Sequence, residues 1–169
     1  MREPEGFSDY VAGSSTRLLR SAWLLTGDWQ TAEDLLQTAL TKAYLHWPKV
    51  SAADSSDAYV RRILMTTYAT WWRRRWRAEL PHEVLPESSA ADGSHAVELR
   101  EAVRAELAKL PRRQRAVVVL RYFDDLTEAE TALALGCSIG TVKSQTSKAL
   151  AKLRASTSIG SLVTEGRLS

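Results

Sequence analysis

The chain has 169 residues, of which 44% are hydrophobic and 25% are charged, with a net charge of +3. This balance is typical of a globular protein with a sizeable core, and the single cysteine, Cys137, excludes an intramolecular disulfide or a multi-cysteine zinc site. No apolar stretch reaches the roughly 18 residues that span a bilayer, and the N-terminal residues MREPEGFSDY lack a signal-peptide core. We therefore expect a soluble, cytoplasmic protein without membrane insertion.

Helical spacing dominates the apolar residues of the first third of the chain, and strand signals are nearly absent throughout, which predicts an all-α fold. A first helix is predicted from Phe7 to Leu25, ending at Gly27. A second is predicted to begin near Thr31 and to be stopped by Pro48. Its apolar face comprises Leu35, Leu36, Ala39, Leu40, Ala43, Tyr44 and Trp47.

The third predicted helix, residues 57–77, carries six arginines against one aspartate, and three tryptophans within six positions. Its buried stripe is predicted to comprise Tyr59, Val60, Ile63, Leu64, Thr67 and Trp71. The other aromatic and hydroxyl side chains cannot all face the same core, so some are expected to lie exposed beside arginines. Such a surface suits unpaired bases, which stack on rings while cations hold phosphates. The alternative for the tryptophans is a role in the core, which is favoured for Trp71. The alternative for the arginine run is a favourable interaction with the C-terminal end of the helix dipole.

Residues 79–96 are predicted to form a flexible acidic linker, with two prolines, four acidic residues and no lysine or arginine. The linker divides the chain into a small helical bundle at 1–78 and another at 97–155, followed by a tail at 156–169. In the second bundle, helical spacing resumes near Val97, and Pro111 opens a further helix through Tyr122.

Residues 127–154 are predicted to form a helix-turn-helix, in which Gly136 ends the first helix and Ser138 caps the second. The buried stripe of the second helix is predicted to comprise Val142, Thr146, Ala149, Leu150 and Leu153. A charged outer face is often only solvated, but residues 141–154 hold four cations and no acidic residue, which favours DNA binding. The side chains expected to enter a major groove are Thr141, Lys143, Ser144, Ser147 and Lys148.

These motifs, in this order and spacing, make the chain resemble a bacterial RNA polymerase sigma factor of the sigma-70 family, extracytoplasmic-function group. The segment AEDLLQTALTKAY (32–44) resembles the family's polymerase-binding helix, and residues 62–74 resemble its helix that reads and melts the −10 element. Residues 135–153 resemble its −35-reading helix-turn-helix. The WWRRRW cluster resembles the actinobacterial SigE-like subgroup.

The resemblance implies a promoter-specificity subunit with no catalytic residue, cofactor or metal of its own. The implied partners are promoter DNA, the clamp helices of the largest polymerase subunit and the flap of the second-largest one. Whether an anti-sigma factor also binds is a question that the sequence leaves open. The implied polymerase contacts are Glu33, Asp34, Gln37 and Lys42. The implied −10 contacts are Arg61, Arg62, Thr66, Thr67, Tyr68, Trp72, Arg73, Arg74 and Arg75. The implied −35 contacts are Arg121, Ser138, Thr141, Lys143, Ser144, Ser147 and Lys148.

Four positions depart from the family's common residues: Thr38, where glutamate is frequent, Thr66, where asparagine is frequent, and Ser147 and Lys148, where a bulky residue and arginine are frequent. A lysine cannot read guanine through the two-pronged contact of an arginine, so we expect Lys148 to hold phosphate or base less selectively. The promoter sequence therefore does not transfer from relatives.

Two other classes of protein are weaker fits. A dimeric helix-turn-helix activator or repressor would share residues 127–154, but residues 7–77 lack the alternating strands and helices of a receiver domain. An enzyme is disfavoured because His46, His82 and His95 are scattered and no glycine-rich phosphate loop is present.

Overall fold

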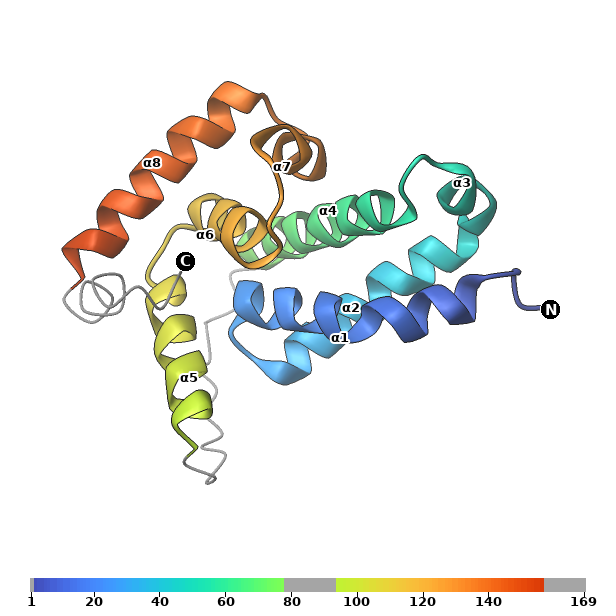
Figure 1. The fold of residues 1–169 in the computed structure, drawn as a ribbon, viewed down its shortest axis with the longest axis horizontal. Helices are drawn as coiled ribbons and strands as arrows, with labels where there is room; N and C mark the ends of the chain where they lie inside the picture. The colour runs from blue at the N-terminus through green and yellow to red at the C-terminus, as the bar shows by residue number, and fades with distance from the viewer. Residues whose placement is uncertain (1, 78–93, 157–169) are drawn as a thin grey trace.

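The computed structural model describes residues 2–77 and 94–156, and every element that these residues form is helical. The N-terminal unit comprises α1 (Phe7–Thr26), α2 (Trp29–Leu45), α3 (Trp47–Ala52) and α4 (Ser56–Arg77). The C-terminal unit comprises α5 (His95–Ala108), α6 (Arg112–Val118), the π-helical turn η1 (Val119–Phe123), α7 (Glu128–Leu135) and α8 (Ile139–Ala155). The predicted all-α class is confirmed, and Figure 1 shows the two units packed side by side.

A short turn with two dedicated caps joins α1 to α2. Gly27 has the left-handed φ of 78° that ends α1, and its N–H donates to the Trp23 carbonyl over 2.7 Å. The next residue, Asp28, caps α2 by accepting a 2.8 Å hydrogen bond from the Thr31 amide. The first helix thus ends where the sequence predicts, and the second begins at Trp29, two residues earlier than expected.

The expectation that α2 continues until Pro48 stops it is wrong. α2 ends at Leu45, and Pro48 stands in the first turn of the short α3, where a missing N–H costs no helical hydrogen bond. The buried Trp47 therefore belongs to α3, and its Nε1 donates to the Glu5 carbonyl over 2.8 Å. Phe7 packs edge-on against the Trp47 ring at 5.2 Å, which ties the start of α1 to α3.

α4 packs against α2, and Val60, Leu64 and Thr67 on its buried side are at most 1% exposed. These residues belong to the stripe that the sequence predicts. Tyr59, expected in the same stripe, is 38% exposed instead. It directly precedes Val60, so it lies at the edge of the stripe, where the side chain turns toward solvent.

The C-terminal unit contains the predicted helix-turn-helix. α7 ends at Gly136, with a left-handed φ of 65°, and Ser138 caps α8 by accepting from the Thr141 amide over 3.1 Å. Val142 and Ala149 of α8 are fully buried, and α8 packs on α6 and α7. One buried stripe thus fixes which side of α8 faces outward.

Replacing Thr127 with alanine should lower the free energy of unfolding by about 1 kcal/mol, because Thr127 caps α7 in a reciprocal capping box with Glu130. Urea unfolding followed by circular dichroism measures the change. Thr38→Ala is the matched control: the Thr38 hydroxyl only donates to the Asp34 carbonyl within α2, so its removal should be nearly neutral. Equal losses in the two variants would contradict the capping role.

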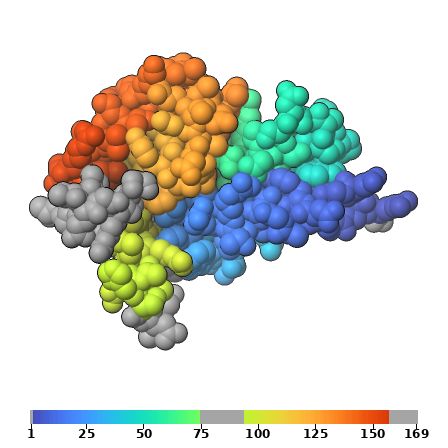
Figure 2. All heavy atoms as spheres, in the orientation of Figure 1, coloured from blue at the N-terminus to red at the C-terminus, as the bar shows by residue number. Residues whose placement is uncertain are grey.

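One apolar core runs through both units. The same cluster contains Leu18 and Leu25 of α1, Leu107 of α5 and Leu120 of η1, and α1 also contacts α6. Figure 2 shows the yellow and orange C-terminal unit lying directly against the blue and green N-terminal one. The two bundles expected from the sequence are therefore joined by packing as well as by the chain between them.

The predicted linker, residues 79–96, lies mostly outside the described residues, although α5 begins at His95, within its expected range. Of the predicted tail at 156–169, only Ser156 is described. Over 2–77 and 94–156, no helix is long and apolar enough to cross a membrane. The same residues bring together no group of three metal-ligating side chains.

Candidate nucleic-acid interfaces

A row of exposed polar side chains runs along α8, opposite its buried stripe. Lys143 and Ser144 are followed one turn later by Ser147 and Lys148, and all four are exposed. This spacing places them on one side of the helix. Figure 1 shows α8 on the far side of α6 and α7 from the N-terminal unit, so the row faces away from the interface between the units. We call these four residues the α8 row.

Three other residues expected at the −35 element have structural contacts. Ser138 caps α8, and its hydroxyl lies 2.9 Å from the hydroxyl of the half-buried Thr141. Arg121 is half-buried and donates from Nη1 to the Leu126 carbonyl, in the loop that leads to α7. These three residues stabilise the helix-turn-helix that presents the α8 row.

The residues expected at the −10 element separate into an exposed group and a buried group on α4. Those that are exposed are Arg62, Thr66, Arg73 and Arg74, with Trp72 half-buried beside them. The side chain of Arg75 lies outside what the structure describes.

Thr67 and Tyr68, which the resemblance implies as −10 contacts, are buried in this arrangement. The Thr67 hydroxyl donates to the Ile63 carbonyl over 2.7 Å and accepts from Lys42 Nζ over 3.0 Å. The Tyr68 hydroxyl donates over 3.0 Å to the Leu25 carbonyl at the end of α1, and burial raises the pKa of this tyrosine. Both side chains therefore hold α4 against α1 and α2.

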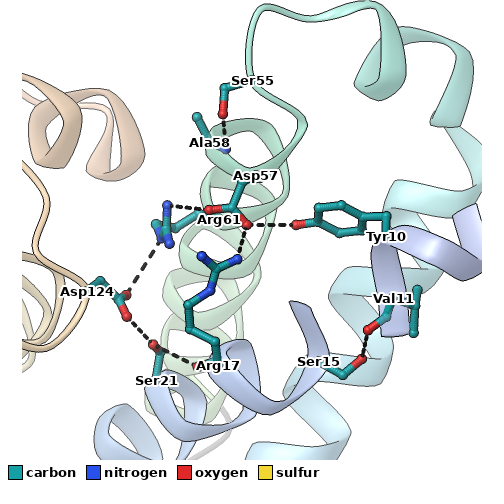
Figure 3. A network of polar contacts seen from close by, with 10 residues as sticks. All are labelled: Tyr10, Val11, Ser15, Arg17, Ser21, Ser55, Asp57, Ala58, Arg61 and Asp124. Atoms are coloured by element: carbon teal, nitrogen blue, oxygen red, sulfur yellow. Dashed lines mark hydrogen bonds and ion pairs between the residues drawn. The ribbon is translucent and has the colours of Figure 1, made fainter. Parts of the chain in front are cut away.

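Arg61 is also buried, with its side chain 7% exposed, and it lies in a network that joins three elements (Figure 3). Its Nη1 lies 3.0 Å from Asp57 Oδ2 on α4, and its Nε lies 3.7 Å from Asp124 Oδ2 at the end of η1. The other oxygen of Asp124 accepts a 2.7 Å hydrogen bond from Ser21 of α1. In this arrangement Arg61 contacts carboxylates of its own chain, and its contact with DNA stays a prediction.

Two side chains of the same network, Asp124 and Tyr10, have raised pKa values. Burial raises the pKa of Asp124 above its usual value, although the hydrogen bond from Ser21 and the charge of Arg61 act in the opposite direction. Burial, followed by the nearby charge of Asp57, raises the pKa of Tyr10 to about 12. The Tyr10 hydroxyl remains a donor, and it donates to Asp57 Oδ1 over 3.1 Å.

The residues expected to contact polymerase lie on α2. Glu33, Asp34 and Gln37 are exposed and share one side of the helix. Lys42 is exposed but donates to Thr67, so it is engaged with α4. An apolar side chain that the sequence analysis did not name, that of Leu45, is 66% exposed at the end of α2. The sequence contains a signal for this exposure: Leu45 follows Asp34 by eleven residues, a spacing that places both side chains on the same face of α2.

Both units match models of known protein families. Residues 13–78 match sigma-70 region 2, and residues 100–153 match sigma-70 region 4. The chain is 44% identical over 154 residues to the RNA polymerase sigma-E factor of Streptomyces coelicolor, an alignment that covers 91% of this chain and 87% of that protein. The chain belongs to the sigma-70 family. It is a sigma factor of the extracytoplasmic-function group, the non-enzymatic subunit through which RNA polymerase recognises promoters and initiates transcription.

Two further likenesses cover nearly the whole sigma factor. The ECF RNA polymerase sigma factor EcfG of Rhodopseudomonas palustris is 28% identical, with 89% of this chain and 84% of that protein aligned. The solved structure of the sigma factor RpoE in complex with the anti-sigma factor NepR, from Bartonella quintana, superposes with a TM-score of 0.75 at 25% identity. That superposition covers 90% of this sigma factor and 96% of RpoE, so the arrangement of helices is shared across both regions.

Proposed function

We propose that the two units of this sigma factor read the two promoter elements separately, α8 at the −35 duplex and α4 at the melted −10 strand. The observation that carries the proposal is the α8 row. Its two lysines and two serines are exposed on the side opposite the buried Val142 and Ala149, and residues 141–154 contain no acidic residue. Short hydroxyl donors and flexible cations on one helix face suit the edges and phosphates of a major groove.

The −10 surface of α4 is narrower in this proposal than the sequence alone suggests. It consists of Arg62, Thr66, Trp72, Arg73 and Arg74, which are exposed or half-buried. A half-buried tryptophan beside exposed arginines offers an aromatic face for an unpaired base and cations for the backbone. Arg61, Thr67 and Tyr68 act by positioning α4, since their polar atoms contact other helices.

Polymerase binding is proposed for the exposed face of α2, with Glu33, Asp34 and Gln37 meeting the clamp helices of the largest subunit and Leu45 extending the contact. The C-terminal unit would meet the flap of the second-largest subunit. Each unit alone offers a small DNA contact, so polymerase supplies affinity by holding both at promoter spacing. This role places the protein in the cytoplasm, and the likeness to RpoE bound to NepR supports an anti-sigma factor as a regulator.

The direct test is reconstitution with core polymerase on a library of random promoter sequences, with Lys143→Ala beside the unchanged protein. Lys143 is exposed and has no acidic neighbour on α8, so we expect a phosphate contact. Its loss should weaken binding on all selected promoters alike and reduce the slope of log K against log salt by about 0.9.

Lys49→Ala, which removes an exposed cation from α3, is the control of equal charge and should leave the slope unchanged. A loss confined to particular sequences would assign Lys143 to a base instead. Unchanged binding in the whole α8 row, tested one residue at a time, would refute α8 as the −35 reader.

A further inference from the structure

A cavity lies where α6 and α7 meet α4 (Figure 1). Its volume is about 770 Å³, within the range of about 300–1,000 Å³ that is typical of small-molecule sites. α4 lines one side of the cavity, while the residues from Leu110 into α6 and the end of α7 line the other. Both units therefore contribute to this cavity, whereas α4 alone forms the proposed −10 surface.

The apolar part of the lining contains two aromatic rings. Tyr68 and Trp72 of α4 meet edge to face, with their ring centres 6.2 Å apart. Met65, from the preceding turn of α4, and Leu135 of α7 line the same cavity. Aromatic and apolar walls suit a flat ring, and a nucleobase is the flat ring that most readily packs against aromatic side chains.

The charged side chains in the described part of the lining are all arginines, namely Arg73, Arg112, Arg113 and Arg115. Arg115 donates to the carbonyls of Leu25 and Leu107, at the ends of α1 and α5. Within residues 2–77 and 94–156, none of the other three arginines forms an ion pair with a carboxylate. Guanidinium groups bind phosphate oxygens in pairs, so this lining favours a ligand that carries phosphates.

The rings and the cations lie next to each other. The guanidinium carbon of Arg112 is 4.7 Å from the centre of the Trp72 ring. Tyr68 lies in the field of the same group of arginines: burial raises the pKa of this tyrosine, while the charges of Arg115 and Arg112 act to lower it. One ligand that carries both a ring and phosphates can therefore contact both parts of the lining.

We propose that this cavity binds a nucleotide that carries two or more phosphates. The base packs against Tyr68 and Trp72, and the phosphates lie between Arg73 on α4 and the two arginines at the start of α6, Arg112 and Arg113. A chain of phosphates offers a pair of oxygens to each of three guanidinium groups, whereas a single phosphate cannot. Such a site is separate from promoter recognition, because part of its lining belongs to the unit that does not read the −10 strand.

Isothermal titration of the full-length free protein with ADP, adenosine and pyrophosphate tests the site. ADP should bind at least about tenfold more tightly than adenosine or pyrophosphate, because only ADP contacts both the rings and the arginines. Pyrophosphate binding as tightly as ADP would show only a basic surface, and adenosine binding as tightly would remove the arginines from the site. Either result, or no binding at about 1 mM ADP, would overturn the proposal.

Variants on the two sides of the cavity distinguish it from the DNA-binding surface of α4. Arg73→Ala on α4 and Arg113→Ala on α6 should each weaken ADP binding by about 5- to 20-fold, because each removes one phosphate contact. Ala69→Phe should weaken it by more than about tenfold, by filling the cavity from an exposed position of α4. Arg100→Ala removes an exposed arginine of α5 outside this lining, so this control of equal charge should bind ADP like the unchanged protein.

Circular dichroism verifies that each variant keeps its helices. A loss in Arg73→Ala with unchanged binding in Arg113→Ala would place ADP on the −10 surface of α4 and would refute a site in the cavity. An equal loss in Arg100→Ala would show that net charge alone governs ADP binding, with the same consequence.

Discussion

Replacing Arg115 with alanine should lower the free energy of unfolding by about 3 kcal/mol or more, a large fraction of the stability of a domain of this size. The Arg115 guanidinium donates from Nε to the Leu107 carbonyl over 2.9 Å and from Nη1 to the Leu25 carbonyl over 2.8 Å. Its Nη2 donates to the carbonyls of Ala108 and Leu110. One cation therefore satisfies the free carbonyls at the ends of both α1 and α5.

Arg115→Lys provides the informative comparison, because lysine keeps the charge but lacks the planar fork that reaches both helix ends. We expect it to recover less than half of the loss, with Arg113→Ala, an exposed neighbour on α6, within about 0.5 kcal/mol of the unchanged protein. Chemical unfolding of all three variants, followed by circular dichroism, measures these differences. Full recovery by lysine would show that the charge alone matters and would contradict the bridging role.

Replacing Trp72 with alanine should reduce open-complex formation by about 5- to 150-fold, the range expected when one base loses an aromatic partner worth roughly 1–3 kcal/mol. Initial binding of the closed promoter should change little, because bases in a duplex have no face free to stack. Permanganate reactivity of unpaired thymines measures opening, and gel mobility at low temperature measures closed binding.

Trp29→Ala is the matched control for the loss of an aromatic ring. Trp29 is 49% exposed at the start of α2 and stacks on Trp23 at 4.8 Å, so its removal should leave promoter opening unchanged. Equal losses at the closed and open steps in Trp72→Ala would instead assign Trp72 to binding of duplex DNA or to folding.

The helix-turn-helix could be predicted from the sequence because its signals are local. The residues that end α7, cap α8 and bury its inner stripe lie within a few positions of one another, and each requirement narrows the choice of residue type. The same holds for the end of α1 at Gly27. The α8 row followed directly, since one buried stripe determines the opposite face.

The burial of Arg61 and Tyr68 could not be predicted in the same way. Their partners lie far along the chain: Asp124 for Arg61, and the Leu25 carbonyl, 43 residues away, for Tyr68. An arginine-rich helix with surplus aromatics is compatible with DNA contact and with packing against a second unit, and only the packed arrangement distinguishes them. The hydrogen bond from Arg115 to the Leu25 carbonyl, 90 residues away, could not be predicted for the same reason.

The division of the promoter between α4 and α8 is tested most directly by mapping crosslinks within one reconstituted holoenzyme–promoter complex. A photoreactive phenylalanine analogue placed at Trp72, or at Ser147 in the α8 row, marks the DNA that each helix contacts. We expect crosslinks from position 72 to the unpaired −10 strand and from position 147 to the −35 duplex, both dependent on core polymerase. Crosslinks from both positions to the same element, or equal crosslinking without polymerase, would contradict it.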